Sequence, residues 1–343
     1  MKRIMLVSLA LVSIAGLAFA AGAQQAATAG EYSWQPNRPI NLIVPWGAGG
    51  STDRSARATA AIVEEQLGVS IVVVNQGGAS GSLGTKAAMD ARRDGYTWTA
   101  GAVKDLGVYK VMGLLDTTLD DWHLYLNVAM PNVISVRADS PYQTFDDLLQ
   151  AFRARPGQVT VATAGVNSAG HTAMELLAKY TGISYRHVTY DGGAPAVTAT
   201  VAGEAEVVPQ LSVEQVDMIR AGRLRPLAVL TTQPLEIEGV AQPIPPITNW
   251  VSDFQAAPIY FGIFVPRGVP QEVVDTLDRI WERHVITSDS LRNWARENAA
   301  FFDPAFGAVA VEKSFPMVQI DAWLKYDAGD AAVNPNTVGI ARP

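Results

Sequence analysis

The stretch INLIVPWGAGGSTD, residues 40–53, contains the pattern that decides the fold. Residues 40–44 are apolar and partly β-branched, which predicts a short buried strand ending before a proline. A loop of Gly, Ser and Thr follows, and residues 54–67 then place apolar side chains at helical spacing. Gly68 is the expected C-terminal cap of this helix. The candidate N-caps are Ser51, Thr52 and Asp53.

The same order of strand, Gly-rich or Ser-rich loop and helix returns further along the chain. The segments are residues 71–74, 77–82 and 83–89; residues 159–162, 163–170 and 171–180; and residues 186–189, 190–193 and 194–202. Further strands are expected at residues 96–99 and 227–230, and helices at residues 270–287 and 289–299. Strands that alternate with helices predict an α/β protein with parallel sheets. A length of 343 residues suggests roughly two domains.

Composition and the N-terminus limit the function classes. The net charge of -7 argues against a basic nucleic-acid-binding surface, and the lack of cysteine excludes disulfides and thiolate chemistry. Lys2 and Arg3 precede an apolar run, residues 4–20, and small residues follow. This predicts a cleaved signal peptide over residues 1–23 and an exported, periplasmic protein. The alternative for this segment is an uncleaved membrane anchor.

The Gly-rich loops have the chemistry of an anion site. In open α/β sheets, ligands lie beyond the carboxyl ends of the strands, where the first N–H groups of each following helix lack partners. Glycine lets a ligand approach the backbone, and Ser and Thr add hydroxyl donors, so such a site needs no Lys or Arg. The alternative is that these glycines serve only tight turns. Trp46 could cover an apolar ligand body, and Lys104 could meet a second carboxylate.

Catalytic and metal motifs are weak in this chain. His171 and Glu175 are one helical turn apart and could share a metal, although such pairs usually make surface or capping contacts. Ser168 and His171 with a remote Asp could mimic a hydrolase triad, but no G-x-S-x-G elbow is present. We therefore expect no metal, no cofactor and no enzymatic activity.

The loops and their neighbours resemble the Bug family, the substrate-binding proteins of tripartite tricarboxylate transporters. The matching segments are residues 39–46, 49–53 with Arg57, 67–68, 72–75, 78–81, 94–97, Gly165, Ser168 and His171, residues 190–195, 221–229 and 265–270. Their order and spacing cover residues 34–325, nearly the whole chain beyond the leader.

The resemblance implies a type II periplasmic-binding-protein-like fold: two α/β lobes with mostly parallel sheets and a ligand in the cleft between them. Residues 34–132 and 257–343 would form lobe 1, and residues 133–256 lobe 2. The ligand would be a small organic acid, and the partners a large and a small membrane subunit. The protein would be a monomer. Two other functions stay open: a periplasmic sensor for a two-component system, and the Ser/His hydrolase.

Four loops and one lysine make up the expected ligand site. The candidate residues are Trp46, Ala48, Gly49, Gly50, Ser51, Thr52, Asp53, Gly78, Ala79, Ser80, Gly81, Ser82, Lys104, Thr163, Ala164, Gly165, Asn167, Ser168, Tyr190, Asp191 and Gly192. Asn167 stands where the family usually has Gly, and Asp191 where Lys is frequent. Both departures bear on the identity of the ligand more than on its class.

Overall fold

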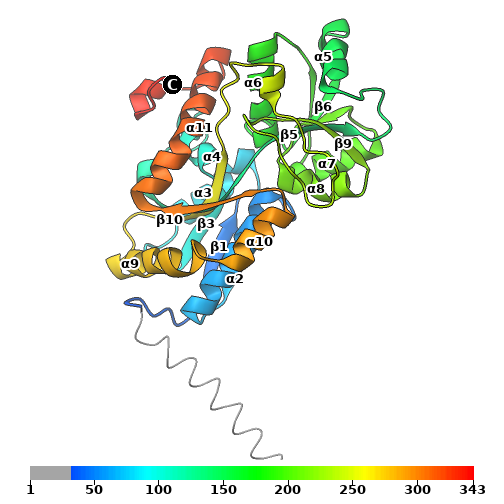
Figure 1. Cartoon of the computed structure of the whole chain (residues 1–343). Helices are drawn as coiled ribbons and strands as arrows, with labels where there is room; N and C mark the ends of the chain where they lie inside the picture. Colours follow the sequence, from blue (N-terminus) through cyan, green and yellow to red (C-terminus); the bar gives the residue numbers. More distant parts are fainter. Residues whose placement is uncertain (1–31) are drawn as a thin grey trace, which may run out of the picture.

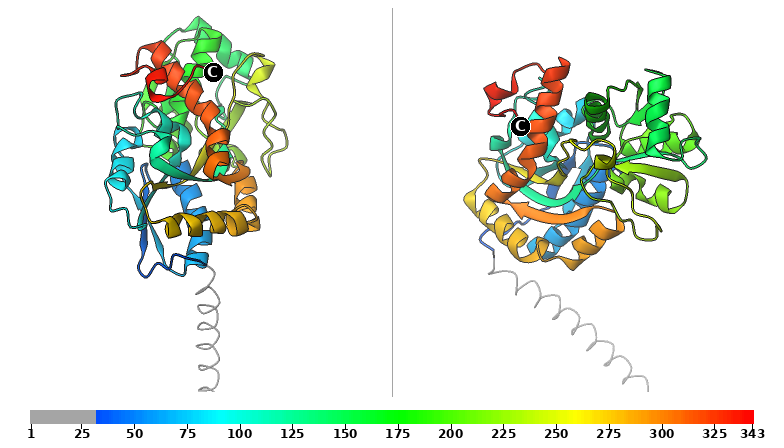
Figure 2. Two further views of the ribbon diagram at one scale, coloured as in Figure 1. Left: turned by 90° about the vertical axis from the view of Figure 1, so that its left-hand side faces the viewer. Right: turned by 45° about the horizontal axis from the view of Figure 1, so that its top comes forward.

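Two β-sheets, each with its own helices, form two lobes that lie side by side (Figures 1 and 2). The computed structural model describes residues 32–343, so the predicted signal peptide lies outside the described residues. The expected α/β architecture with two lobes is confirmed. We call the part built on the six-stranded sheet the first lobe and the part built on the five-stranded sheet the second lobe.

The six-stranded sheet has the order β11-β4-β10-β3-β1-β2. Its strands are β1 (Ile40–Val44), β2 (Ile71–Asn75), β3 (Thr97–Ala102), β4 (Trp122–Met130), β10 (Ile259–Pro266) and β11 (Phe301–Phe306). β1 pairs in parallel with β2 and β3, whereas β10 runs antiparallel to β3 and β4, and β11 antiparallel to β4. β10 is buried along its whole length, so it forms the centre of this lobe.

The five-stranded sheet has the order β7-β6-β8-β5-β9. Its strands are β5 (Val133–Arg137), β6 (Thr160–Thr163), β7 (Arg186–Thr189), β8 (Val207–Val208) and β9 (Leu224–Val229). β6 is parallel to β7 and β8, and β5 is antiparallel to β8 and β9. Both sheets are therefore mixed, not mostly parallel. The strands that precede the Gly-rich loops, which are β1, β2, β6 and β7, all take part in parallel pairs.

Helices cover the sheets in each lobe, as Figure 1 shows. The first lobe carries α2 (Ser51–Leu67), α3 (Ser82–Met89), α4 (Val103–Val108), α9 (Gln271–Ile280), α10 (Asp289–Glu297) and α11 (Gly307–Ala328). The second carries α5 (Phe145–Ala154), α6 (Ala169–Thr181), α7 (Gly193–Ala202) and α8 (Ser212–Arg220). The helix expected over residues 270–287 ends at Ile280 and continues as a π-helical turn, η4 (Trp281–Val285). Within residues 32–343, none of the helices combines the length and apolarity needed to cross a bilayer.

The chain passes between the lobes twice. The short crossing is Pro131-Asn132, between β4 and β5, and the long one is residues 230–258, between β9 and β10. The long α11 belongs to the first lobe but also packs against α6 of the second. The two lobes are thus joined by two chain crossings, by the packing of α11 on α6, and by Arg54 of α2, which bonds the Val213 carbonyl of α8. Loops that follow the parallel strands of both lobes meet between them.

Candidate functional site

Three helix N-termini converge on one small cavity between the lobes. α2 comes from the first lobe, and α6 and α7 from the second. The cavity has a volume of about 40 Å³, which holds one or a few water molecules. Its lining residues are Trp46, Gly47, Gly50, Ser51, Thr52, Ala102, Asp105, Ala164, Ser168, Ala169, Gly192, Gly193, Gln210, Leu211, Glu214 and Phe261. The first N–H groups and positive dipole ends of three helices therefore face the same point.

The sequence of each loop explains where its helix begins. α2 has Gly50 as its N-cap, so none of the three expected capping side chains occupies that position. Asp53 instead accepts a hydrogen bond from the Gly49 N–H, at 3.0 Å, and folds the loop back on the first turn. Ser168 caps α6 through its side chain, and Gly192 precedes α7 with a φ of 112° that favours glycine. The glycine N-caps of α2 and α7 supply no capping side chain to the first N–H groups of these helices.

The carboxylate of Glu214 lies at the cavity, against the N-terminus of α2. Glu214 belongs to the first turn of α8 in the second lobe, and its Oε1 accepts a hydrogen bond from the Ser51 N–H of α2, at 3.2 Å. Burial raises the pKa of the Glu214 carboxyl, and hydrogen bonds from Ser51 oppose that shift. A carboxylate of the chain itself is thus held by the donors that the sequence assigned to a ligand.

Two buried amide side chains lie close to the same loops. Gln210 lines the cavity, is 1% exposed, and its Nε2 has no hydrogen-bond partner. Asn167 is fully buried, and neither polar atom of its side chain is paired. Asn167 has a φ of 66°, in the left-handed region that Gly enters freely and Asn tolerates. The local backbone therefore accommodates Asn at position 167.

The second Gly-rich loop bridges the two lobes. Gly78, Ala79, Ser80 and Gly81 all have positive φ, at 122°, 46°, 55° and 88°. Such runs are costly for non-glycine residues and persist where surrounding contacts enforce them. The Ser80 hydroxyl donates to the Val166 carbonyl of the second lobe, at 2.6 Å, and Ser80 O accepts from the Tyr109 hydroxyl, at 3.2 Å. This loop of the first lobe thus binds the second lobe through the Ser80–Val166 hydrogen bond.

Lys104 lies in a buried ion cluster. Its Nζ donates to Asp105 at 2.7 Å, to Asp321 at 3.2 Å and to the Asn167 carbonyl of the second lobe at 2.9 Å. Burial alone would lower the pKa of Lys104, but Asp105 and Asp321 outweigh it and raise that pKa. Lys104 therefore links the lobes through the Asn167 carbonyl, and it does not line the cavity.

The ion cluster continues along α11 and α6. Asp321 accepts a hydrogen bond from the Thr172 hydroxyl at 3.0 Å, and Lys325 forms an ion pair with Glu175. Burial, helped by Lys325 and His187, lowers the pKa of His171 to about 3, so this ring is neutral at pH 7. These contacts join the long helix of the first lobe to α6 of the second lobe.

The Ser168 hydroxyl does not reach the ring of His171. It donates to the Gly165 carbonyl at 2.7 Å and accepts from the backbone N–H of His171. The His171 ring stacks on His187, with centroids 4.3 Å apart. In the part of the chain that the structure describes, no three His, Asp or Glu side chains gather to hold a metal ion. Ser168 acts here as a helix cap.

The structure brings one third of the predicted site residues to the cavity wall. Those lining it are Trp46, Gly50, Ser51, Thr52, Ala164, Ser168 and Gly192. The remainder lie around it: Asp53 bonds Gly49, Thr163 contacts His187 Nε2 at 2.5 Å, Tyr190 bonds Glu204, and Asp191 is exposed. The ligand-binding role of all these residues stays a prediction.

Sequence reasoning missed the wall built from α4 and α8. Asp105, Gln210, Leu211 and Glu214 come from segments with no Gly-rich loop. Position 193, one residue beyond the predicted set, also lines the cavity. The available signal was Gln210 followed by Glu214 near the start of α8, and such a pair is too common to indicate a site.

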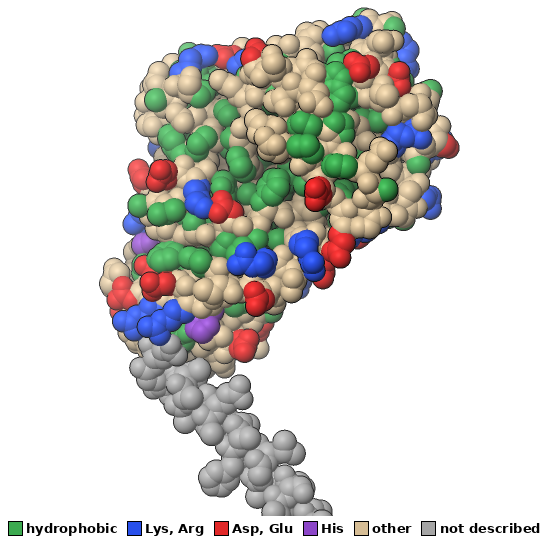
Figure 3. Space-filling view, in the orientation of Figure 1, with side chains coloured by type: hydrophobic (Ala, Val, Ile, Leu, Met, Phe, Trp, Pro, Cys, Tyr) green, Lys and Arg blue, Asp and Glu red, His purple; other side chains and the backbone are tan. Residues whose placement is uncertain are grey.

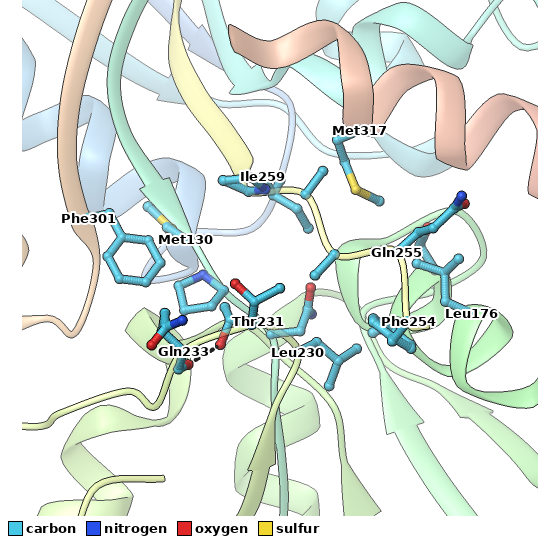
Figure 4. Close-up of a pocket in the computed structure, with 18 of the residues that line it drawn as sticks. Met130, Leu176, Leu230, Thr231, Gln233, Phe254, Gln255, Ile259, Phe301 and Met317 are labelled. Carbon is cyan, nitrogen blue, oxygen red and sulfur yellow. Dashed lines mark hydrogen bonds between the residues drawn. The ribbon is translucent and has the colours of Figure 1, made fainter. Parts of the chain in front are cut away.

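A second, larger cavity of about 310 Å³ lies where the lobes are joined (Figure 4). Both chain crossings contribute to it, and Figure 4 shows Met130, Ile259, Phe254, Leu176, Phe301 and Met317 around the space. Hydrophobic side chains gather over the middle of the face drawn in Figure 3, interrupted by a few charged ones. Lys, Arg, Asp and Glu are absent from the lining of this cavity among residues 32–343, so it differs in chemistry from the site between the loops.

Comparison with known proteins settles the family. The family model described as "Tripartite tricarboxylate transporter family receptor" matches residues 55–295. The chain belongs to this receptor family. BugT of Bordetella pertussis is 31% identical over 254 residues, which cover 71% of this chain and 75% of BugT. The resemblance drawn from the loop motifs is confirmed.

Solved structures of other proteins have the same fold. The R. palustris protein Rpa4515, solved with adipate, has a TM-score of 0.74 at 27% identity, covering 90% of this chain and 99% of its own. The periplasmic binding protein BugD has a TM-score of 0.76 at 23% identity, covering 86% and 99%. The receptor fold of this chain is therefore that of periplasmic binding proteins.

Proposed function

We propose that this receptor captures a small organic acid between its lobes and delivers it to a tripartite tricarboxylate transporter. The observation that carries the proposal is the convergence of the N-termini of α2, α6 and α7 from both lobes on one point. Each end offers N–H donors and a positive dipole, which favour a carboxylate. Adipate in Rpa4515 supports the same ligand class.

Binding alone is the activity that this arrangement supports. The donors are backbone N–H groups and hydroxyls on rigid helix starts, and the site spans two lobes, so closure around the ligand completes it. The Ser168 hydroxyl is engaged with Gly165, which argues against a nucleophile activated by His171. We therefore keep the expectation that the protein is not an enzyme and needs no cofactor.

The cellular setting follows from the leader and the family. We assign residues 1–23 to a cleaved signal peptide and the mature chain to the periplasm, as a monomer. We place the lobe boundaries at 132/133 and 256/257, which agrees with the distribution of strands between the sheets. The partners would be one large and one small membrane subunit.

The donor on α2 provides the test. We would titrate adipate, malate and citrate into the mature protein and into the Ser51→Leu variant by calorimetry. A leucine at the first residue of α2 would fill the space in front of the N–H groups, so we expect at least a tenfold loss of affinity, about 1.4 kcal/mol. Ser290→Leu, at an exposed position in the first turn of α10 that does not line the cavity, is the control. Equal affinity for Ser51→Leu and the control would contradict the proposal.

A further inference from the structure

Glu214 reaches across the boundary between the lobes. It lies in the first turn of α8, where its own N–H donates to the Leu211 carbonyl at 3.0 Å. Its side chain extends to the first lobe and accepts from Ser51 N–H at 3.2 Å. Glu214 thus contributes a carboxylate from one lobe to a helix N-terminus of the other, which is the bond expected of a bound acid.

Glycine at position 193 leaves the room that this carboxylate needs. A Cβ at Gly193 would overlap the carboxylate carbon and both oxygens of Glu214. The backbone of Gly193 does not have a positive φ, so conformation alone does not require glycine there. A Cβ at Gly50 would lie 3.5 Å from Oε1 of Glu214, in ordinary contact. The helix starts are therefore shaped around the Glu214 carboxylate.

A second carboxylate cannot share the site with Glu214. The remaining cavity measures about 40 Å³, which is far below the roughly 300–1,000 Å³ of pockets that hold small-molecule ligands. Two carboxylates at such close range also disfavour each other's charged form. Lys and Arg side chains are absent from the cavity lining within residues 32–343. The nearby cation is Arg54 of α2, whose charge acts on the Glu214 carboxyl and opposes the rise of its pKa. Glu214 and a ligand carboxylate are mutually exclusive here.

A buried amide gives an independent sign that the site is built for more than Glu214. The Nε2 group of Gln210 is buried against the cavity and donates to no group of the protein. An unpaired buried donor costs stability, so its position at the wall suits an acceptor brought by a ligand. The site therefore holds donors that Glu214 does not use.

We propose that Glu214 is an internal competitor of the ligand: its carboxylate occupies the carboxylate subsite, holds the unliganded lobes together, and leaves when an acid binds. This inference rests on the proposed function, because the competing ligand is the organic acid of the same site. The apparent dissociation constant equals the intrinsic one divided by the fraction of molecules in which Glu214 has left. If that fraction is about one tenth, the residue weakens binding about tenfold and so sets the affinity of the receptor.

The test combines two measurements on four proteins. The proteins are the mature wild type, Glu214→Ala, Glu214→Gln and the control Glu236→Gln, which changes an exposed glutamate of the second lobe. Small-angle X-ray scattering without ligand reports whether the lobes separate. Calorimetric titration with adipate, malate and citrate reports affinity. We expect both Glu214 variants to show a larger radius of gyration than wild type, and to bind the acid at least tenfold more tightly, with Ala above Gln.

Different outcomes separate this inference from the proposed function. An unchanged radius of gyration in the Glu214 variants, or affinity that is equal to or weaker than wild type, would overturn the competitor role. Weaker binding would make Glu214 a ligand-contacting group instead. If no acid binds any of the four proteins, the proposed function fails, while scattering still decides whether Glu214 holds the lobes together. The control should match wild type in both measurements.

Discussion

At the scale of single residues, this site depends on glycines that lack a side chain as well as on residues that supply hydrogen-bond donors. Gly50 and Gly192 end the loops without a capping side chain, and Gly193 lacks the Cβ that would meet Glu214. The sequence predicted the glycines because Gly-rich loops after strands are visible in one dimension. It could not predict Glu214, because only the packing of α8 against the second sheet brings this residue to α2.

A methyl group at position 193 should lower the stability of the folded protein only by displacing the side chain of Glu214. Gly193→Ala forces the side chain of Glu214 to move, and overpacking of this kind costs about 1–3 kcal/mol. In a Glu214→Ala background, the same substitution should cost nothing or stabilise α7, because alanine favours helices. Urea unfolding of the four proteins of this cycle measures the coupling. Additive effects of the two substitutions would refute the contact.

His171 should make the free energy of unfolding decrease as the pH falls. Its pKa in the folded protein is lowered to about 3, against about 6.5 in the unfolded chain. Between these values the unfolded state binds a proton that the folded state does not, so stability falls as pH decreases below about 6.5. His171→Gln removes this contribution, which approaches about 1.4 kcal/mol per pH unit. Urea unfolding from pH 7 to 5 should show a shallower decline for the variant; parallel curves would contradict the account.

At the scale of elements, the sequence was most informative about the strand–loop–helix units. β1 with α2, β6 with α6, and β7 with α7 lie close to the residues that were predicted. The antiparallel strands β5, β10 and β11 were not predicted as such. The direction of these strands depends on where the chain crosses between the lobes. The local periodicity of side chains does not indicate where such a crossing occurs.

The contact between α11 and α6 should depend on its buried charges. Lys325 is completely buried and pairs with Glu175, so Lys325→Met would leave that carboxylate without its cation. Loss of one partner of a buried pair typically costs about 3–5 kcal/mol. The double variant Lys325→Met with Glu175→Gln should recover most of this loss, since no unpaired charge remains. Urea unfolding measures both effects, and a double variant as unstable as the single one would show that packing, not charge, matters here.

At the scale of the whole molecule, the chain crosses twice between two lobes, and the Gly-rich loops of both lobes meet at the cavity. The lobe contacts include the loop contacts at the cavity, through Ser80, Lys104 and Glu214, and the α11–α6 charges. They also include Arg54 of α2, which bonds the Val213 carbonyl of α8. The motifs predicted the two lobes and the cleft, because family resemblance carries topology. The sequence could not reveal that the lobes close on a carboxylate of the chain itself, since this is a property of the assembled fold.

The measurement that tests the central claim most directly is thermal unfolding of the mature protein with matched ligands. The panel would hold citrate, C4–C6 dicarboxylates, amino acids and aromatic acids, together with the amide of each acid. A ligand at 1,000 times its dissociation constant adds about 4 kcal/mol of stability, which raises the midpoint by several degrees. We predict such a shift with at least one acid and none with its amide. Shifts from amides alone, or from no carboxylate in the panel, would contradict a carboxylate site built from helix N-termini.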